Sequence, residues 1–186
     1  MAVELQGRLE DEAHAMTLLA LNTEEADYYG NPRKDWDVVI DRFPDTVIDV
    51  EEARKCFALS RYAAAVFHTM QVVEVGLIEL GKFIQVRDPK SGWTAVANEL
   101  KKIVVKKYED RTDFERQHFE LLEQVQGTVE ALKNAWRNKV SHAQGRLILM
   151  NQDFSPEIAE EILFASRSFM RRLATDLPAA QLGSDL

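Results

Sequence analysis

Apolar residues recur every three to five positions over long stretches of this chain, which is the spacing of a buried helix face. The clearest stripe consists of Phe57, Tyr62, Val66, Met70, Val73, Leu77, Leu80 and Ile84. Asp49 followed by Glu51 and Glu52 predicts a helix start, and no proline interrupts the chain from there to Val86. The pattern therefore predicts one helix of about 50 Å as the spine of the fold.

Three more helices are predicted downstream of this stripe. Their starts follow turn chemistry at residues 88–92, a capping box formed by Thr112 and Glu115, and the segment Ser155-Pro156-Glu157. The helix opened by the capping box carries a second long apolar stripe. It is expected to end near His142, because Gly145 is a stop signal.

The first 44 residues show weaker signals and are predicted to form a helical extension. One helix is expected over residues 3–21, and Asn22 with Glu25 indicates a second, short helix start. Breaks are expected at residues 30–32 and 43–45, because glycine and proline interrupt helices there.

These elements predict an all-α helical bundle of four to five main helices, two of them long core helices. Alternating polar and apolar positions and hairpin turn pairs are scarce, so no sheet is expected. A chain of 186 residues is long enough for one domain with a real core. We therefore expect a single domain over residues 1–186.

Composition and charge narrow the function classes. The net charge is −8, and residues 1–53 carry 14 acidic and 4 basic side chains, so the remainder is slightly basic. No apolar run approaches the roughly 18 residues of a membrane span, and the acidic first residues do not resemble a leader. The single cysteine, Cys56, excludes an internal disulfide and a zinc site built from cysteines, and it fits a reducing compartment. We expect a cytoplasmic protein without membrane association.

One stretch departs from the overall acidity. Between Glu130 and Asp153 there is no acidic residue. The bases in this window are Lys133, Arg137, Lys139 and Arg146. A local basic window is compatible with holding a phosphate.

Several kinds of site are absent from the sequence. It contains no glycine-rich phosphate loop, no nucleophile elbow and no His-Glu-x-x-His motif. The four histidines lie far apart, and no two of them have helical metal-ligand spacing. We therefore expect neither a metal nor a cofactor.

A short motif lies inside the acid-free window. The stretch ALKNAWRNKVSHAQG contains Arg137, Asn138 and, after three further residues, His142. It resembles the Arg-x-x-x-x-His signature of HEPN domains, and residues 45–175 resemble one bacterial group of small HEPN-like proteins. The resemblance implies an all-α, usually dimeric bundle. Many HEPN domains are metal-independent endoribonucleases, often toxins or defence effectors, and others are non-catalytic binding modules.

The chemistry of the motif residues agrees with ribonuclease activity. RNA cleavage without a metal uses the neighbouring 2′-hydroxyl as nucleophile. Histidine exchanges protons near neutral pH, which suits His142 as acid or base. Arg137 would bind phosphate oxygens, and Asn138 would orient His142 or contact phosphate. Lys133, Lys139 and Arg146 are the candidate phosphate contacts, with RNA as the expected partner.

The partners follow from the same argument. One histidine cannot easily serve as acid and base together, so a two-fold dimer that joins two motif sets is expected. The resemblance further implies an antitoxin or nucleotidyltransferase partner. The alternative function is a catalytically inactive HEPN-like module that binds a nucleotide or a protein. In that case Arg137 and His142 are cations at the end of a helix. His68, on an apolar helix, is expected to be a core or interface histidine rather than a ligand.

Overall fold

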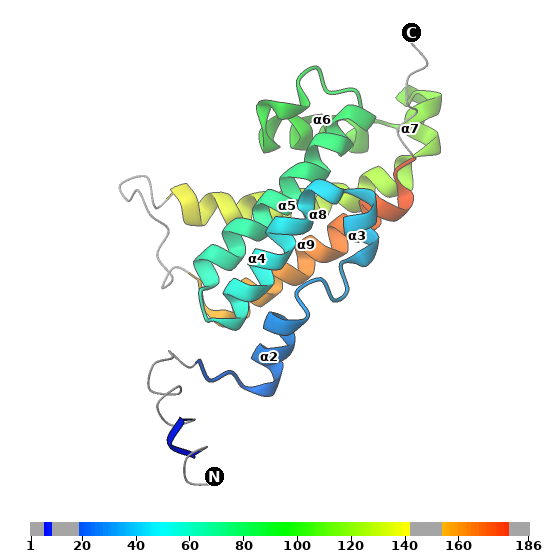
Figure 1. Cartoon of the computed structure of the whole chain (residues 1–186). Coiled ribbons are helices and arrows are strands. Elements are labelled where there is room, and N and C mark those ends of the chain that lie inside the picture. Colours follow the sequence, from blue (N-terminus) through cyan, green and yellow to red (C-terminus); the bar gives the residue numbers. More distant parts are fainter. Residues whose placement is uncertain (1–5, 9–18, 142–153, 179–186) are drawn as a thin grey trace.

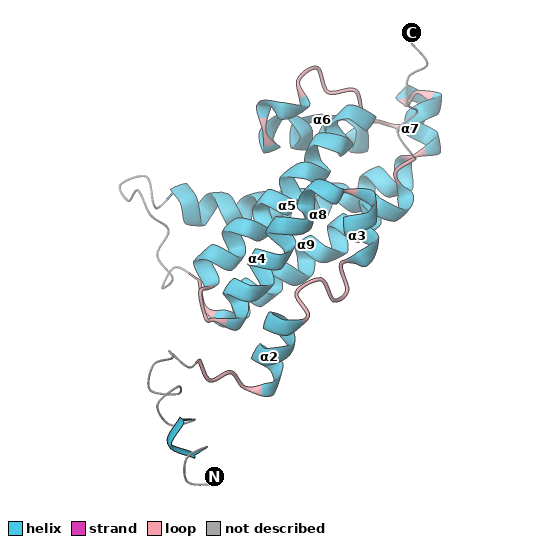
Figure 2. Cartoon of the chain, in the orientation of Figure 1, coloured by secondary structure: helices cyan, strands magenta, loops and turns pink. Residues whose placement is uncertain are grey.

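The structure is a computed structural model that describes residues 6–8, 19–141 and 154–178. Within these ranges the protein is all-α, and no strand is present (Figures 1 and 2). The α-helices are α2 (Thr23–Gly30), α3 (Asp37–Arg42), α4 (Val47–Ala58), α5 (Tyr62–Phe83), α6 (Trp93–Val105), α7 (Asp113–Gln117), α8 (Phe119–Ser141) and α9 (Pro156–Asp176). Short 3-10 turns lie at Pro44–Thr46, Pro89–Ser91 and Tyr108–Asp110. The predicted all-α class is confirmed.

Helix α5 is the centre of the core. It packs against α4, α6 and α9, and α8 in turn packs against α6 and α9 (Figure 1). Val66, Val73 and Leu80 of α5 are fully buried. Their partners in the same apolar cluster include Leu122, Val125 and Val129 of α8 and Met170 and Leu173 of α9. These residues hold the bundle together through burial of apolar surface.

The predicted single helix from Asp49 to Val86 is wrong, because the chain turns between α4 and α5. Ser60 takes a left-handed conformation with φ 55°. The N–H of Arg61 donates to the Cys56 carbonyl at 2.8 Å, and the N–H of Ser60 donates to the Phe57 carbonyl at 3.0 Å. These two bonds form a Schellman motif, which ends a helix. The apolar stripe is therefore divided between two helices, α4 and α5, which pack against each other.

The other predicted helix starts have mixed outcomes. The capping box of Asn22 with Glu25 and the Ser155 N-cap are both present. The Thr112 capping box is also present, but the helix it opens stops at His118 before α8 begins. The predicted N-cap at Asp49 is wrong, because α4 already begins at Val47, after the 3-10 turn.

The N-terminal segment contributes to the core. The predicted breaks after α2 and α3 are confirmed. Residues 19–22 are not helical, so the helix expected over 3–21 does not reach its predicted end, and most of it lies outside the described residues. Trp36, Val39 and Phe43 are buried in the main cluster, and α3 packs on α9. The expected extension is therefore part of the bundle from Trp36 onward.

Helix α5 is also the one helix in the described part of the chain that is long and apolar enough to cross a membrane. Its most apolar window has a mean hydropathy of 1.3, and 56% of that window is buried inside the protein. The core helix of a soluble protein meets the same criteria. The absence of membrane association and the cytoplasmic location stay predictions.

Candidate functional site

The predicted catalytic motif begins in the final turns of α8. The backbone of this helix includes Arg137, Asn138 and Lys139, and it is described up to Ser141. In Figure 1 this end of α8, in yellow, projects at the edge of the bundle. The side chains of these three residues, and all of His142 and Arg146, lie outside what the structure describes.

Lys133 is the one predicted phosphate contact whose side chain is described. Its Nζ lies 2.7 Å from Oε2 of Glu130, one helical turn earlier. Only 15% of the Lys133 side chain is exposed. A phosphate bound at Lys133 would therefore compete with Glu130.

A second cationic site was not anticipated from the sequence. Arg54 of α4 is 5% exposed, and its guanidinium carbon lies 4.1 Å from the centre of the Tyr28 ring. Its Nε is buried without a hydrogen-bond partner, and it forms no ion pair with any residue that the structure describes. Burial is the largest effect on the pKa of Arg54 and lowers it. The nearby charges of Asp27 and Asp35 raise this pKa, and the positive charge of Arg167 lowers it further. A buried guanidinium without a directly bonded anion is costly.

A cavity of about 100 Å³ lies beside this arginine. It is lined by Tyr28, Trp36, Arg54, Glu160, Leu163, Phe164 and Arg167. Arg167 also pairs with Asp35, Nη1 to Oδ2, at 3.2 Å. The cavity can hold a phosphate or carboxylate group, which guanidinium groups bind through paired hydrogen bonds. No sequence signal pointed to it, because Tyr28, Arg54 and Arg167 are far apart in the chain.

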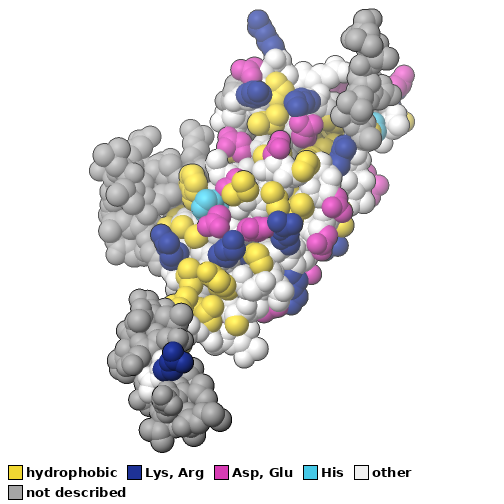
Figure 3. Space-filling view, viewed as in Figure 1, with side chains coloured by type: hydrophobic (Ala, Val, Ile, Leu, Met, Phe, Trp, Pro, Cys, Tyr) yellow, Lys and Arg dark blue, Asp and Glu magenta, His cyan; other side chains and the backbone are white. Residues whose placement is uncertain are grey.

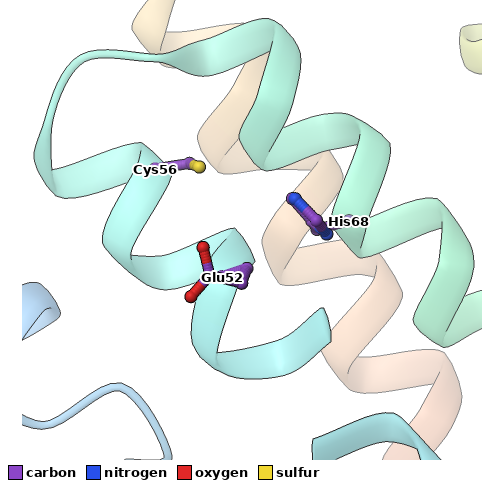
Figure 4. Close-up of side chains that lie close together, drawn as sticks. All are labelled: Glu52, Cys56 and His68. Atoms are coloured by element: carbon purple, nitrogen blue, oxygen red, sulfur yellow. The ribbon is translucent and has the colours of Figure 1, made fainter. Parts of the chain in front are cut away.

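A third group of polar side chains joins α4 and α5. Glu52, Cys56 and His68 each offer a ligand atom, and these atoms all lie within 4.8 Å of one another (Figure 4). Nδ1 of His68 lies 2.7 Å from Oδ1 of Asp49. His68 is thus a partly buried, hydrogen-bonded histidine. Glu52 and Cys56 lie one helical turn apart in the sequence, but with one cysteine and no histidine pair at ligand spacing the sequence predicted no metal site, and nothing in it shows that His68 faces these two residues.

Charges on the visible face of the bundle are mixed. Figure 3 shows Lys and Arg side chains interspersed with Asp and Glu side chains along the described part of that face. Exposed ion pairs such as Arg33 with Glu51, at 2.6 Å, and Lys34 with Asp27, at 2.7 Å, belong to this pattern. The described part of that face therefore offers no broad basic surface to a nucleic acid.

Comparisons with known proteins add no assignment. No family model matches the chain, and searches of curated proteins and of solved structures found no match either.

Proposed function

We propose that the chain is a HEPN-like, metal-independent endoribonuclease of the toxin or defence-effector kind. The observation that carries the proposal is the position of Arg137 and Asn138. They lie in the last turns of a core helix of an all-α bundle, within the acid-free window and five and four residues before His142.

The proposed reaction uses the RNA's own nucleophile. His142 accepts the proton of the 2′-hydroxyl as its oxygen attacks the adjacent phosphorus. The bond from phosphorus to the 5′-oxygen breaks, and that oxygen takes up a proton from the His142 of the second copy. The products are a 2′,3′-cyclic phosphate and a 5′-hydroxyl. Arg137 stabilises the charge on the phosphorane, and Lys139 and Arg146 hold flanking phosphates.

The test combines cleavage with stability. Purified protein is incubated with labelled RNA in EDTA, and melting temperature is measured on the same samples. His142→Ala is expected to slow cleavage by about 10²–10⁴-fold without unfolding the protein, the usual range for general acid–base catalysis. Arg137→Lys is expected not to restore the activity lost in Arg137→Ala, because an ammonium lacks the bidentate fork. Arg172→Ala, an exposed arginine on α9, serves as the control.

Two outcomes would contradict the proposal. If the His142 and Arg137 variants cleave like the wild type but melt at lower temperature, the motif is a helix terminus. If light scattering shows a monomer at micromolar concentration while cleavage persists, the shared acid–base arrangement of a homodimer is wrong.

A second candidate function rests on the cavity at Arg54. The chain would then be a catalytically inactive module that recognises a phosphate group of a nucleotide or a carboxylate of a partner protein. The observation that favours it is the buried guanidinium of Arg54, whose Nε has no hydrogen-bond partner and whose charge interacts with Asp27 and Asp35 without an ion pair to either. A protein that does not cleave RNA, yet is stabilised by inorganic phosphate in the wild type and not in Arg54→Met, would favour this function.

A further inference from the structure

We propose that Glu52, Cys56 and His68 bind a transition-metal ion of the Zn²⁺ class between α4 and α5, with Asp49 positioning His68. This inference is independent of the proposed cleavage, because the three ligands lie on α4 and α5 and the motif lies on α8.

The hairpin between α4 and α5 creates the arrangement. Glu52 and Cys56 are one helical turn apart, so they share a face of α4. The turn at Ser60 brings α5 back along α4, which places His68 opposite that face (Figure 4). A tetrahedral zinc ion separates its donor atoms by roughly 3.3–3.8 Å, since its bonds measure about 2.0–2.3 Å. Side-chain adjustments of about 1 Å convert the present spacing, within 4.8 Å, into that geometry.

Asp49 prepares His68 to act as a ligand. Because an aspartate carboxylate accepts hydrogen bonds, the 2.7 Å contact has Nδ1–H of His68 donating to Oδ1 of Asp49. The neutral ring then carries its free lone pair on Nε2. A carboxylate bonded to the far side of a histidine is the usual outer-shell partner in zinc sites, where it sets the tautomer and the ring orientation.

The donor set selects the kind of metal. A thiolate, an imidazole and a carboxylate suit zinc and chemically similar ions, whereas Ca²⁺ and Mg²⁺ prefer oxygen ligands alone. Three protein ligands leave a fourth position for water. That position is accessible from solvent, because the Glu52 side chain is 44% exposed and that of His68 is 26% exposed.

Binding requires the loss of the Cys56 thiol proton and of an ion pair of Glu52. Burial raises the pKa of the Cys56 thiol above its usual value. A bound metal displaces the thiol proton, so uptake of the ion releases protons. To bind the metal, Glu52 gives up a 3.4 Å ion pair with Lys55. That pair is partly exposed to solvent, so it contributes little to stability.

The same group of side chains also resembles a catalytic triad, with Cys56 as the nucleophile, His68 as the base and an acidic residue that orients the histidine. That interpretation is weaker, because Cys56 is only 8% exposed and packs against Ala65 and Leu163. A substrate carbonyl would have no room beside a sulfur so enclosed, and a raised thiol pKa disfavours the reactive thiolate. A small ion approaching from the Glu52 side requires far less space.

Cobalt titration of the full chain tests the site. Co²⁺ adopts tetrahedral zinc sites, and its bond to a thiolate gives near-ultraviolet charge-transfer absorption. Metal-free wild type is expected to develop this absorption and saturate at one ion per chain. His68→Asn and Glu52→Gln retain the thiol and are expected to bind at least about tenfold more weakly, and Asp49→Asn about 10–100-fold more weakly. Glu74→Gln, an exposed acid on α5, is the matched control and is expected to bind like the wild type.

A second readout uses Cys56, the sole cysteine of the chain. Because Cys56 is buried, a thiol reagent reaches it only when α4 and α5 open locally, and Zn²⁺ is expected to slow that reaction in the wild type and not in His68→Asn. Circular dichroism confirms that each variant is folded, and Glu52→Gln, at an exposed position, leaves no cavity. Equal Co²⁺ affinity in wild type, Glu52→Gln and His68→Asn would overturn the site. Because neither readout involves RNA, a protein that binds cobalt but does not cleave RNA retains this inference and loses the nuclease.

Discussion

Glu115 shows how one side chain combines capping with a buried ion pair. Its carboxylate accepts from the Thr112 N–H at 2.9 Å and from Lys106 Nζ at 2.6 Å. Burial of this group favours the neutral form, but the bonds from Lys106 and Thr112 outweigh that effect and lower the pKa. The carboxylate therefore ties α7 to the end of α6.

This arrangement predicts a pH-dependent stability. Because folding lowers the pKa of Glu115, the unfolded chain takes up the proton first as the pH falls. The contribution is present above the usual glutamate pKa of about 4.3 and is lost below it. Glu115→Gln is expected to cost about 1–3 kcal/mol in urea unfolding at neutral pH. The difference from wild type should be smaller at about pH 3 than at neutral pH.

The matched control is Glu123→Gln, an exposed acid on α8, which is expected to change stability by less than about 0.5 kcal/mol. A Glu115 effect of the same size at both pH values would mean that the ionised pair contributes nothing.

At the scale of elements, the contact between α5 and α9 depends on a glycine. A Cβ built on Gly76 would collide with the sulfur of Met170 and would lie 3.0 Å from Cδ1 of Leu173. Both side chains are fully buried, so neither has free space into which to move. Gly127 on α8, by contrast, has nothing within 4 Å of such a Cβ.

The two glycines predict opposite effects of the same substitution. Gly76→Ala is expected to lower the free energy of unfolding by about 1–3 kcal/mol through overpacking. Gly127→Ala is expected to raise it by up to about 1 kcal/mol, because alanine favours the helix. Chemical unfolding of both variants checks this, and stabilisation by Gly76→Ala would show that α5 and α9 are not in close contact there.

The elements also show what the sequence can predict. Helix starts at Asn22, Thr112 and Ser155 were predictable because a capping box or N-cap is a local contact between near neighbours. The end of α4 was not, because Ser60 occupies a left-handed position where glycine or asparagine is the usual signal. The break at His118 was hidden in the same way, since the apolar stripe continues through it.

The candidate sites also differ in whether their residues are neighbours in the sequence. The motif on α8 is contiguous and could be read from the sequence. The Arg54 cavity and the Glu52–Cys56–His68 cluster arise only when separate helices pack together. Nothing in the sequence shows that these residues meet, because the sequence does not reveal the turn at Ser60 or the helix packing.

At the scale of the whole molecule, the N-terminal segment is tied to the end of the chain. Trp36, Val39 and Phe43 belong to the core. Nη2 of Arg42 donates to the carbonyl oxygen of Pro178 at 2.8 Å, which closes α3 onto the end of α9. Residues 36–43 are therefore required for the stability of the bundle.

Adjacent valines on α3 test this requirement. Val39 is fully buried, whereas Val38 is 47% exposed. Val39→Ala is expected to cost about 2 kcal/mol, from two methyl groups at about 0.8 kcal/mol each plus a small cavity. Val38→Ala should stay within about 0.5 kcal/mol of wild type. Equal melting temperatures for the two variants would mean that α3 does not belong to the core.

The packing of α5 against α9 has a consequence for the protein as it is being made. The ribosome releases α5 first, and the face of α5 beside Gly76 stays bare until residues 156–176 have followed. During that interval the nascent chain displays its most apolar helix, the same segment that has the length and hydropathy of a membrane span. A chain interrupted before Phe154 never covers the face of α5 that packs against α9. Such fragments are natural substrates for chaperones and prone to aggregate.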